Sequence, residues 1–289
     1  MTKPAPTALP DFIIIGAMKC GTSTLAAQLG AQPGIFMTNP KEPNFFSDDA
    51  VWARGPGWYQ SLFAQAQSGD LLGEASTHYT KLPTYPDTIA RLQGMVAAPR
   101  LVYLIRNPVD RLVSHFIHEW TMGVMDGAID EAVQDHPELV EYGCYGAQMA
   151  PWVDAFGADA VMIQTTARMR RDPQAVVAEV AAFIGHTGAV SWRDLPPENV
   201  SAERIRRRPL DAWLIDSAAA TWLRRRLVPQ ALRDRVKAGR QMRERPVLSP
   251  ETRAAVEARF AADHAVLTAI TGARHDIDAC YPFLRGTAA

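Results

Sequence analysis

Short, largely apolar runs alternate along this chain with segments whose apolar residues recur every three or four positions. The runs are bounded by turn residues and predict strands at Phe12–Ile15, Leu71–Glu74, Leu101–Ile105 and Ala160–Gln164. The periodic segments predict helices at Thr22–Gly30, Pro108–Met122, Asp172–Ile184 and Ser249–Thr271. Strands that alternate with helices in this way predict an α/β fold: a single domain with a central parallel β-sheet flanked by helices.

Length and composition are those of a globular chain. It has 289 residues, of which 47% are hydrophobic and 21% charged, so it can bury a sizeable core. We expect one domain over residues 1–289, with residues 1–10 as a flexible tail. No run of about 18 apolar residues occurs, and the N-terminus lacks the apolar centre of a signal peptide. We therefore expect no membrane span.

The number and spacing of the cysteines indicate the redox state of the cellular compartment. Cys20, Cys144 and Cys280 are the three cysteines of the chain, and none of them has C-x-x-C spacing. Three such cysteines build neither a disulfide scaffold nor a zinc site. The simplest prediction is a reducing, cytoplasmic location.

The balanced net charge conceals a basic segment. The chain carries a net charge of −1, yet residues 200–245 contain 13 Lys or Arg against 5 Asp or Glu. This local excess of 8 leaves −9 for the rest of the chain. A local anionic ligand fits this asymmetry better than general nucleic-acid binding, so we expect no nucleic-acid partner. Solvated helix faces are an equally open interpretation of the segment.

The first candidate site is a glycine-containing loop between the first predicted strand and the first predicted helix. Its sequence is Gly16-Ala-Met-Lys19-Cys20-Gly21-Thr22-Ser23-Thr24. Backbone N–H groups at such a turn, together with the helix N-terminus, bind an anion, and Gly21 permits close approach of the backbone. Lys19 supplies a positive charge, and the three hydroxyls add hydrogen-bond donors.

This loop departs from the P-loop of nucleotide hydrolases. In that motif a lysine directly follows the second glycine, whereas here Thr22 holds that place and Lys19 comes two residues before Gly21. The strand Leu101–Ile105 also continues into Arg106 rather than ending in an aspartate. An ordinary Mg-nucleotide hydrolase is therefore disfavoured. A P-loop nucleotide kinase or phosphotransferase is kept as the alternative function.

A second candidate anion site follows the strand Leu101–Ile105. Arg106 stands at the carboxyl end of that strand, where open α/β sheets bind ligands, and Ser114 lies about two turns into the next helix. An arginine fork and a serine hydroxyl can converge on one phosphate. Arg111 either joins them or pairs with Asp110 or Glu119 on the surface.

Together, these two motifs resemble the signature motifs of sulfotransferases that use PAPS (3′-phosphoadenosine 5′-phosphosulfate). Further runs resemble the heparan-sulfate-type branch of that family and its bacterial relatives: Lys41-Glu-Pro-Asn-Phe-Phe46, Gly57-Trp-Tyr59, and Gly143-Cys-Tyr145 with Trp152 and Phe156. The resemblance covers roughly residues 11–185. It implies a P-loop-like sulfotransferase fold and sulfuryl transfer from PAPS to an acceptor hydroxyl or amine, with PAP as product and no metal.

The resemblance also implies roles for individual residues. The first loop would bind the 5′-phosphosulfate, and the second motif would bind the 3′-phosphate. Lys19 is in addition the candidate cation on the leaving phosphate, and Glu42 matches the catalytic glutamate of the heparan-sulfate-type branch. His78 is the alternative base, and a surface pair with Lys41 is the alternative interpretation of Glu42. The assigned positions are Lys19, Cys20, Gly21, Thr22, Ser23 and Thr24 for the first site, and Arg106 and Ser114 for the second.

Two features weaken the match to the branch's glycan enzymes. Those enzymes carry a Glu-Lys pair where this chain has Glu74 followed by Ala75. The resemblance fades after about residue 190, where Arg204–Arg208 occupies the place of the family's basic closing loop. A carbohydrate or glycolipid acceptor follows from the branch, while a small alcohol or natural product stays open, as does the oligomeric state.

The sequence permits two further interpretations. His115, His118 and Glu119 form a scrambled version of a zinc-protease motif, and the order of the residues argues against a metal site. A non-catalytic protein that binds PAP or another nucleotide is the third functional hypothesis. Such a protein would not depend on Glu42 or His78.

Overall fold

A five-stranded parallel sheet forms the centre of the computed structural model, which describes residues 8–196, 242, 244–271 and 277–286. The sheet order is β2-β3-β1-β4-β5, and all of its pairings are parallel. The strands are β1 (Phe12–Gly16), β2 (Ile35–Met37), β3 (Leu71–Ala75), β4 (Arg100–Ile105) and β5 (Val161–Thr165). The predicted parallel α/β fold is confirmed. Residues 1–7 of the predicted tail lie outside the described residues, and the extent of the domain stays a prediction.

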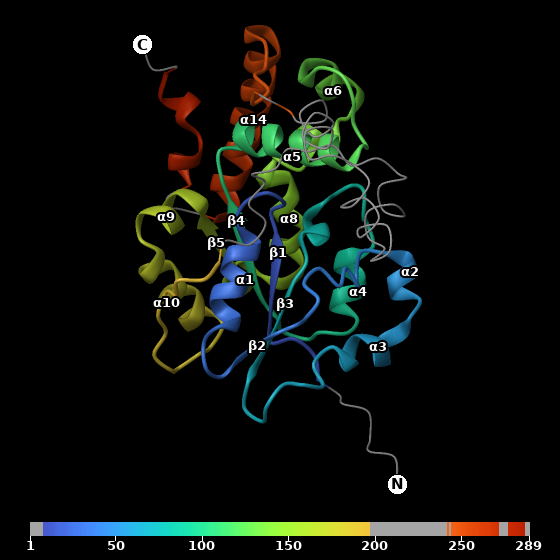
Figure 1. Cartoon of the computed structure of the whole chain (residues 1–289), viewed down its shortest axis with the longest axis vertical. Helices are drawn as coiled ribbons and strands as arrows, with labels where there is room; N and C mark the ends of the chain where they lie inside the picture. The colour runs from blue at the N-terminus through green and yellow to red at the C-terminus, as the bar shows by residue number, and fades with distance from the viewer. Residues whose placement is uncertain (1–7, 197–241, 243, 272–276, 287–289) are drawn as a thin grey trace, which may run out of the picture.

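Helices cover both faces of this sheet (Figure 1). The chain leaves β1 toward β2 but leaves β4 toward β5, so right-handed connections place α1 and α8 on opposite faces. The α-helices of the described residues are α1 (Thr22–Gly30), α2 (Asp49–Trp52), α3 (Gly55–Ser61), α4 (Thr88–Gln93), α5 (Pro108–Met122), α6 (Ile129–Asp135), α7 (Glu138–Glu141), α8 (Tyr145–Phe156), α9 (Thr166–Arg171), α10 (Pro173–Phe183) and α14 (Pro250–Thr271). The 3₁₀ helices are η1 (Thr77–Thr80), η2 (Ala158–Ala160), η4 (Asp278–Cys280) and η5 (Pro282–Gly286).

The central strands are buried on both faces, which explains their continuous apolar runs. All residues of β1 are buried, as are all residues of β4 after Arg100. Strands covered by helices on both sides lose the alternation of apolar and polar residues that a half-exposed strand shows. Their carboxyl ends point toward the end of the molecule that carries α5, α6 and α14 (top of Figure 1). The loops that carry the candidate residues therefore gather at that end.

Local signals set the bounds of α5 where the sequence predicts them. The side chain of Asn107 accepts hydrogen bonds from the backbone N–H groups of Val109 and Asp110, and Pro108 occupies the first turn. Gly123 ends the helix in the left-handed conformation, with φ 77°. The side chains at the start of α5 thus come directly after the carboxyl end of β4.

The sequence analysis missed one strand of the sheet and several helices. Strand β2 has three residues, too few for a pattern of hydrophobicity to stand out. The helices α2, α3, α4, α6, α7, α8 and α9 also went unpredicted, and α8 contains Pro151 within its length. The predicted strands and helices otherwise appear within one residue of their expected ends.

Candidate active site

The loop between β1 and α1 presents uncapped amides at the carboxyl end of the central strand. Gly21 precedes α1 with φ 87°, and a Cβ on it would lie 2.8 Å from the Met169 side chain. Lys19 also adopts a left-handed conformation, with φ 66°. No side chain caps α1 and its first turn holds no acidic residue, so its leading N–H groups are available to an anion.

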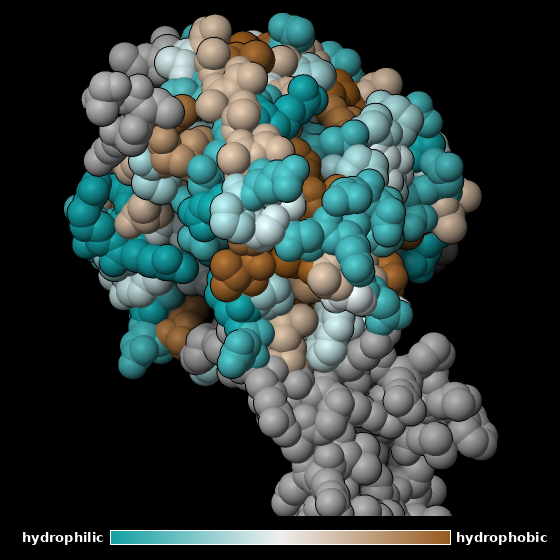
Figure 2. All heavy atoms as spheres, turned by 90° about the horizontal axis from the view of Figure 1, so that it is seen from above, coloured by the Kyte–Doolittle hydropathy of each residue, from teal (hydrophilic) through white to brown (hydrophobic). Residues whose placement is uncertain are grey.

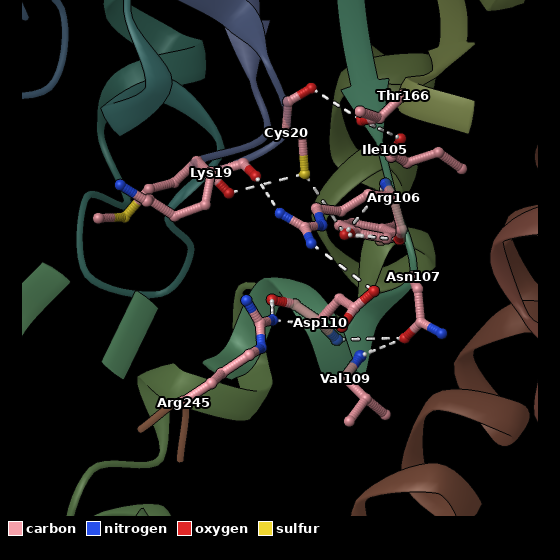
Figure 3. Close-up of polar contacts among 11 residues, drawn as sticks. Lys19, Cys20, Ile105, Arg106, Asn107, Val109, Asp110, Thr166 and Arg245 are labelled. Carbon is pink, nitrogen blue, oxygen red and sulfur yellow. Dashed lines mark hydrogen bonds and ion pairs between the residues drawn. The ribbon is translucent and has the colours of Figure 1, made fainter. Parts of the chain in front are cut away.

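Arg106 reaches this loop from the end of β4 (Figure 3). Its Nη1 donates to the backbone carbonyl of Lys19 at 3.3 Å, and its Nη2 lies 3.7 Å from a carboxylate oxygen of Asp110. The other oxygen of Asp110 faces Arg245 at 3.3 Å. Both contacts of Arg106 are long, and its side chain is 18% exposed, so guanidinium N–H groups remain for a ligand.

The two candidate anion sites border one cavity of about 410 Å³. Lys19, Gly21 and Thr24 line it from the β1–α1 loop and α1, and Arg106 lines it from β4. The structure therefore brings together residues from both predicted motifs. The remaining lining residues are Thr166, Met169, Arg170, Pro173 and Trp192.

Sequence reasoning did not single out these remaining residues. Thr166, Met169 and Arg170 follow directly on β5, which stands beside β4 in the sheet. The rule that ligands lie at the carboxyl ends of parallel strands could have drawn attention to them. Thr166 Oγ1 lies 2.9 Å from the Cys20 carbonyl and 3.1 Å from that of Ile105, so it ties this segment to both loops.

Other predicted members of the site lie behind the cavity wall. Cys20 is fully buried, and its Sγ lies 3.5 Å from the hydroxyl of Tyr145. That same hydroxyl donates to the Arg106 carbonyl at 3.1 Å. Tyr145 therefore connects the two loops from beneath. Thr22 is buried at the start of α1, while Ser23 and Ser114 are half-buried and do not line the cavity.

The surface interpretation of Arg111 is wrong. Its side chain is fully buried and donates to the Leu139 carbonyl and toward Nδ1 of His115 at 3.4 Å. Arg111 stands on the face of α5 that packs into the core, so it neither joins Arg106 nor pairs with Asp110. The structure thus leaves Arg106 as the arginine of this motif that lines the cavity.

Glu42 is held by the segment that follows β3. Its backbone N–H donates to the Ala75 carbonyl at 2.9 Å, and its carboxylate accepts from the N–H and hydroxyl of Thr77. The predicted pair with Lys41 is present at 2.5 Å. Burial alone would raise the pKa of Glu42, but Lys41 and Thr77 hold it below its usual value. The carboxylate is therefore ionised at neutral pH.

A buried carboxyl group supports the loop that carries Glu42. Glu74 is fully buried and accepts hydrogen bonds from the hydroxyls of Tyr59 and Ser76. Ser76 Oγ in turn accepts from the backbone N–H of Asn44 at 3.1 Å. Glu42 and Asn44 both have positive φ, at 60° and 55°. Glu74 thus helps to hold this turn, and its hydrogen-bond partners among the described residues are hydroxyl groups rather than an arginine.

Two basic side chains flank Glu42. His78 stacks on Tyr85 with ring centroids 4.9 Å apart, and burial together with nearby Lys81 lowers its pKa to about 4. The ammonium of Lys81 lies 5.9 Å from the centre of the Tyr142 ring, and burial lowers its pKa as well. Sequence reasoning missed Lys81. The sequence gives only a weak indication of it. The heparan-sulfate-type branch has a lysine where this chain has Ala75, and in this chain a lysine occurs six residues later.

Two features of the described residues bear on metal and membrane binding. Within those ranges, no group of three or more His, Cys, Asp or Glu side chains is arranged to hold a metal ion. Across the same residues, no helix combines the length and the apolar character that crossing a bilayer requires.

Comparison with known protein families places this geometry in context. The model of the sulfotransferase domain matches residues 9–206 of the chain. The chain belongs to the sulfotransferase domain family. The match spans the β1–α1 loop, Glu42 and Arg106, so the resemblance predicted from the motifs is confirmed. The basic run Arg204–Arg208 lies outside the described residues.

Similar sulfotransferases occur among animal and amoebal proteins. Heparan sulfate glucosamine 3-O-sulfotransferase 6 of Mus musculus is 26% identical over 194 residues, which is 63% of this chain and 54% of that protein. Membrane-associated sulfotransferase kil1 of Dictyostelium discoideum is 37% identical over 117 residues, 39% of this chain and 24% of that protein. The matched part is therefore about half of the first relative and a quarter of the second.

A solved structure shares the fold of this sulfotransferase. The sulfotransferase from Alicyclobacillus acidocaldarius superimposes with a TM-score of 0.67 at 24% identity. The superposition covers 94% of this chain and 98% of the other. The P-loop-like sulfotransferase fold predicted from the sequence is confirmed by this likeness together with the parallel sheet.

Proposed function

We propose that this protein transfers a sulfuryl group from PAPS to a hydroxyl, or an amine, of an acceptor and releases PAP. The observation that carries the proposal is the single cavity bordered by Lys19, by the uncapped start of α1 and by Arg106. Two anion-binding elements on one cavity suit a nucleotide with phosphates at two positions of its ribose. A volume of about 410 Å³ is also in the range of nucleotide-sized sites.

The donor set of the cavity fits such a nucleotide. The amides before α1 and the Thr24 hydroxyl suit a 5′-phosphosulfate, and Arg106 suits a 3′-phosphate. Met169 and Trp192 supply the apolar faces that an adenine ring needs. PAPS would supply the sulfuryl group, which leaves the 5′-phosphate as the acceptor oxygen or nitrogen bonds to sulfur. The assignment of Ser114 to the 3′-phosphate stays a prediction.

Lys19 and Glu42 take the chemical roles. The Lys19 ammonium stabilises negative charge as it develops on the departing phosphate. Glu42 accepts the proton of the acceptor, for which an ionised carboxylate is required. His78 stays the alternative base: its ring stacks on Tyr85 and is unprotonated at neutral pH, since burial lowers its pKa to about 4. Carbohydrate and glycolipid acceptors follow from the relatives, and a cytoplasmic location is part of the same proposal.

Calorimetry with PAP, ADP and ATP, each with and without Mg²⁺, tests the proposal. We expect PAP to bind tightly without metal and ADP to bind weakly, after which labelled PAPS is used to screen acceptors. Mg²⁺-dependent ATP binding with no preference for PAP would instead favour a kinase. Tight PAP binding with no transfer to any acceptor would favour a nucleotide-binding protein without catalysis.

A further inference from the structure

Trp192 lines the cavity from a segment that belongs to no helix or strand. Residues 190–193 have no regular secondary structure, whereas the other lining residues stand on α1, α9 and α10 or in the turns after β1 and β4. The cavity lies at the carboxyl ends of the strands, and at that end of the molecule hydrophobic patches interrupt a hydrophilic surface (Figure 2). An extended segment without a neighbouring strand needs other partners for its backbone N–H and C=O groups. The position of Trp192 therefore depends on the elements beside this segment.

Two glutamines of α1 pair with the backbone of this segment from one side. Gln28 Nε2 donates to the Arg193 carbonyl at 2.8 Å, and its Oε1 accepts from the Arg193 N–H at 2.8 Å. Gln32 makes the same pair of bonds with Ser191, at 2.9 Å to the carbonyl and 3.1 Å from the N–H. Both glutamines are only 3% exposed. Residues four apart on a helix lie on one face, so α1 presents both carboxamides to the segment together.

A third glutamine, near the start of α10, pairs with the segment from the other side. Gln174 Nε2 donates to the Val190 carbonyl at 3.1 Å, and its Oε1 accepts from the backbone N–H of Trp192 at 2.8 Å. Hydrogen bonds that alternate between two sides are those of a strand within a sheet. The glutamine clamp, defined as Gln28, Gln32 and Gln174, therefore takes the place of two neighbouring strands.

The chemistry of the carboxamide suits this task. It carries a donor and an acceptor without a charge, so one side chain satisfies both an N–H and a C=O of the backbone. A carboxylate in the same place would offer the carbonyl no donor. Ordering a free segment during ligand binding weakens the binding, because the lost conformational freedom costs free energy. The six hydrogen bonds of the clamp meet that cost before the ligand arrives.

We propose that the three glutamines of the clamp are positioning residues, which hold Trp192 as a wall for the base of the bound nucleotide. This inference rests on the proposed function, because it concerns the nucleotide of that reaction. None of the three glutamines touches the reacting groups in that proposal, and their effect on binding passes through Trp192. Helix α1 then serves both ends of the nucleotide: its uncapped start faces the phosphates, and its buried glutamines fix the wall for the base.

Calorimetry on the full chain with two ligands tests the inference. One ligand is PAP, and the other is 1-deoxyribose 3,5-bisphosphate, which keeps both phosphates and lacks the base. Gln174→Ala is the first variant, because this glutamine is exposed and alanine suits a helix. We expect it to weaken PAP binding roughly three- to tenfold and to leave the base-free ligand unaffected. Gln93→Ala is the matched control, since Gln93 is also exposed and donates to a backbone carbonyl, that of Ala155 at 3.0 Å.

A second pair of variants shows whether the clamp acts through the tryptophan. Trp192→Ala should weaken PAP binding roughly 5- to 150-fold, the range for loss of one aromatic side chain that stacks on a base. Addition of Gln174→Ala to Trp192→Ala should cause no further loss, because the wall that the clamp holds is already absent. A glutamine that merely stabilises the fold would weaken binding equally in both backgrounds.

The outcomes separate this inference from the function on which it rests. Equal losses for PAP and the base-free ligand in Gln174→Ala would overturn the inference, as would a full further loss in the Trp192→Ala background or an equal loss in Gln93→Ala. Unchanged PAP affinity in both Gln174→Ala and the buried variant Gln32→Met would overturn it as well. If ADP or ATP binds and PAP does not, the proposed function falls, and the same variants titrated with that nucleotide decide the role of the clamp. Failure of the wild type to bind any of the three would overturn both.

Discussion

Replacement of Arg106 by alanine separates the proposed 3′-phosphate contact from a role in shaping the loop. Within the described residues, the Arg106 side chain contacts the Lys19 carbonyl at 3.3 Å and Asp110 at 3.7 Å. A half-exposed ion pair of this length contributes about 0–1 kcal/mol, so Asp110 competes weakly with a phosphate for the guanidinium. Charge-assisted hydrogen bonds to a phosphate contribute about 1.5–3 kcal/mol. Loss of these bonds weakens PAP binding roughly 10- to 150-fold.

The assay compares PAP with adenosine 5′-monophosphate, which differs from it only in lacking the 3′-phosphate. Arg106→Ala should weaken binding of the monophosphate at most about fivefold, because only the hydrogen bond to the Lys19 carbonyl is lost. Arg245→Ala is the matched control, since it removes the other arginine beside Asp110 and does not line the cavity. Equal losses for the two nucleotides in Arg106→Ala would refute the assignment of the 3′-phosphate to Arg106.

Three further predictions concern the base, the loop and the buried carboxyl group. Glu42→Gln should lower kcat about 100-fold or more and spare PAP affinity, whereas unchanged turnover would move the role to His78. The pKa of Glu42 is lowered, so its active, ionised form persists above that pKa. The kcat of the wild type should therefore stay level down to about pH 5 and fall at lower pH. A loss of kcat that begins near pH 7 would contradict this prediction. Gly21→Ala should lower the free energy of unfolding by about 1–2 kcal/mol in chemical denaturation and weaken PAP binding, because φ 87° is strained for alanine. An unchanged free energy of unfolding would contradict the positive φ at this position. Glu74→Ala should lower both the melting temperature and kcat, with less effect on PAP affinity, and an unchanged kcat would separate Glu74 from Glu42.

The sequence predicted those parts of the fold that local chemistry sets. The strands β1 and β4 are continuous apolar runs because both of their faces are buried. Asn107, Pro108 and Gly123 delimit α5 through capping, which depends only on neighbouring residues. The glycine loop and Arg106 could be placed at one edge of the sheet, because each directly follows the carboxyl end of a predicted parallel strand. Their convergence on one cavity follows from adjacent parallel strands.

Features that depend on packing between distant segments escaped prediction. Arg111 looks like an anion ligand in the sequence, yet the core-facing side of α5 holds it among buried residues. Trp192 reaches the cavity from a segment without regular secondary structure, and no pattern in the sequence marks it. Lys81 lies over the ring of Tyr142, which is far along the chain. Side-chain direction in each case is set by tertiary contacts.

Lys19 connects the two parts of the proposed site, the cavity beside Arg106 and the carboxylate of Glu42. Its backbone carbonyl accepts a hydrogen bond from Arg106, while the negative charges of Glu119 and Glu42 raise the pKa of its ammonium. Burial disfavours the charged ammonium, and these carboxylates oppose that loss of charge. A positive charge held in a partly buried site stabilises developing negative charge more strongly than it would in water. The carboxylates of Glu119 and Glu42 therefore help to keep Lys19 charged, as its proposed role in sulfuryl transfer requires.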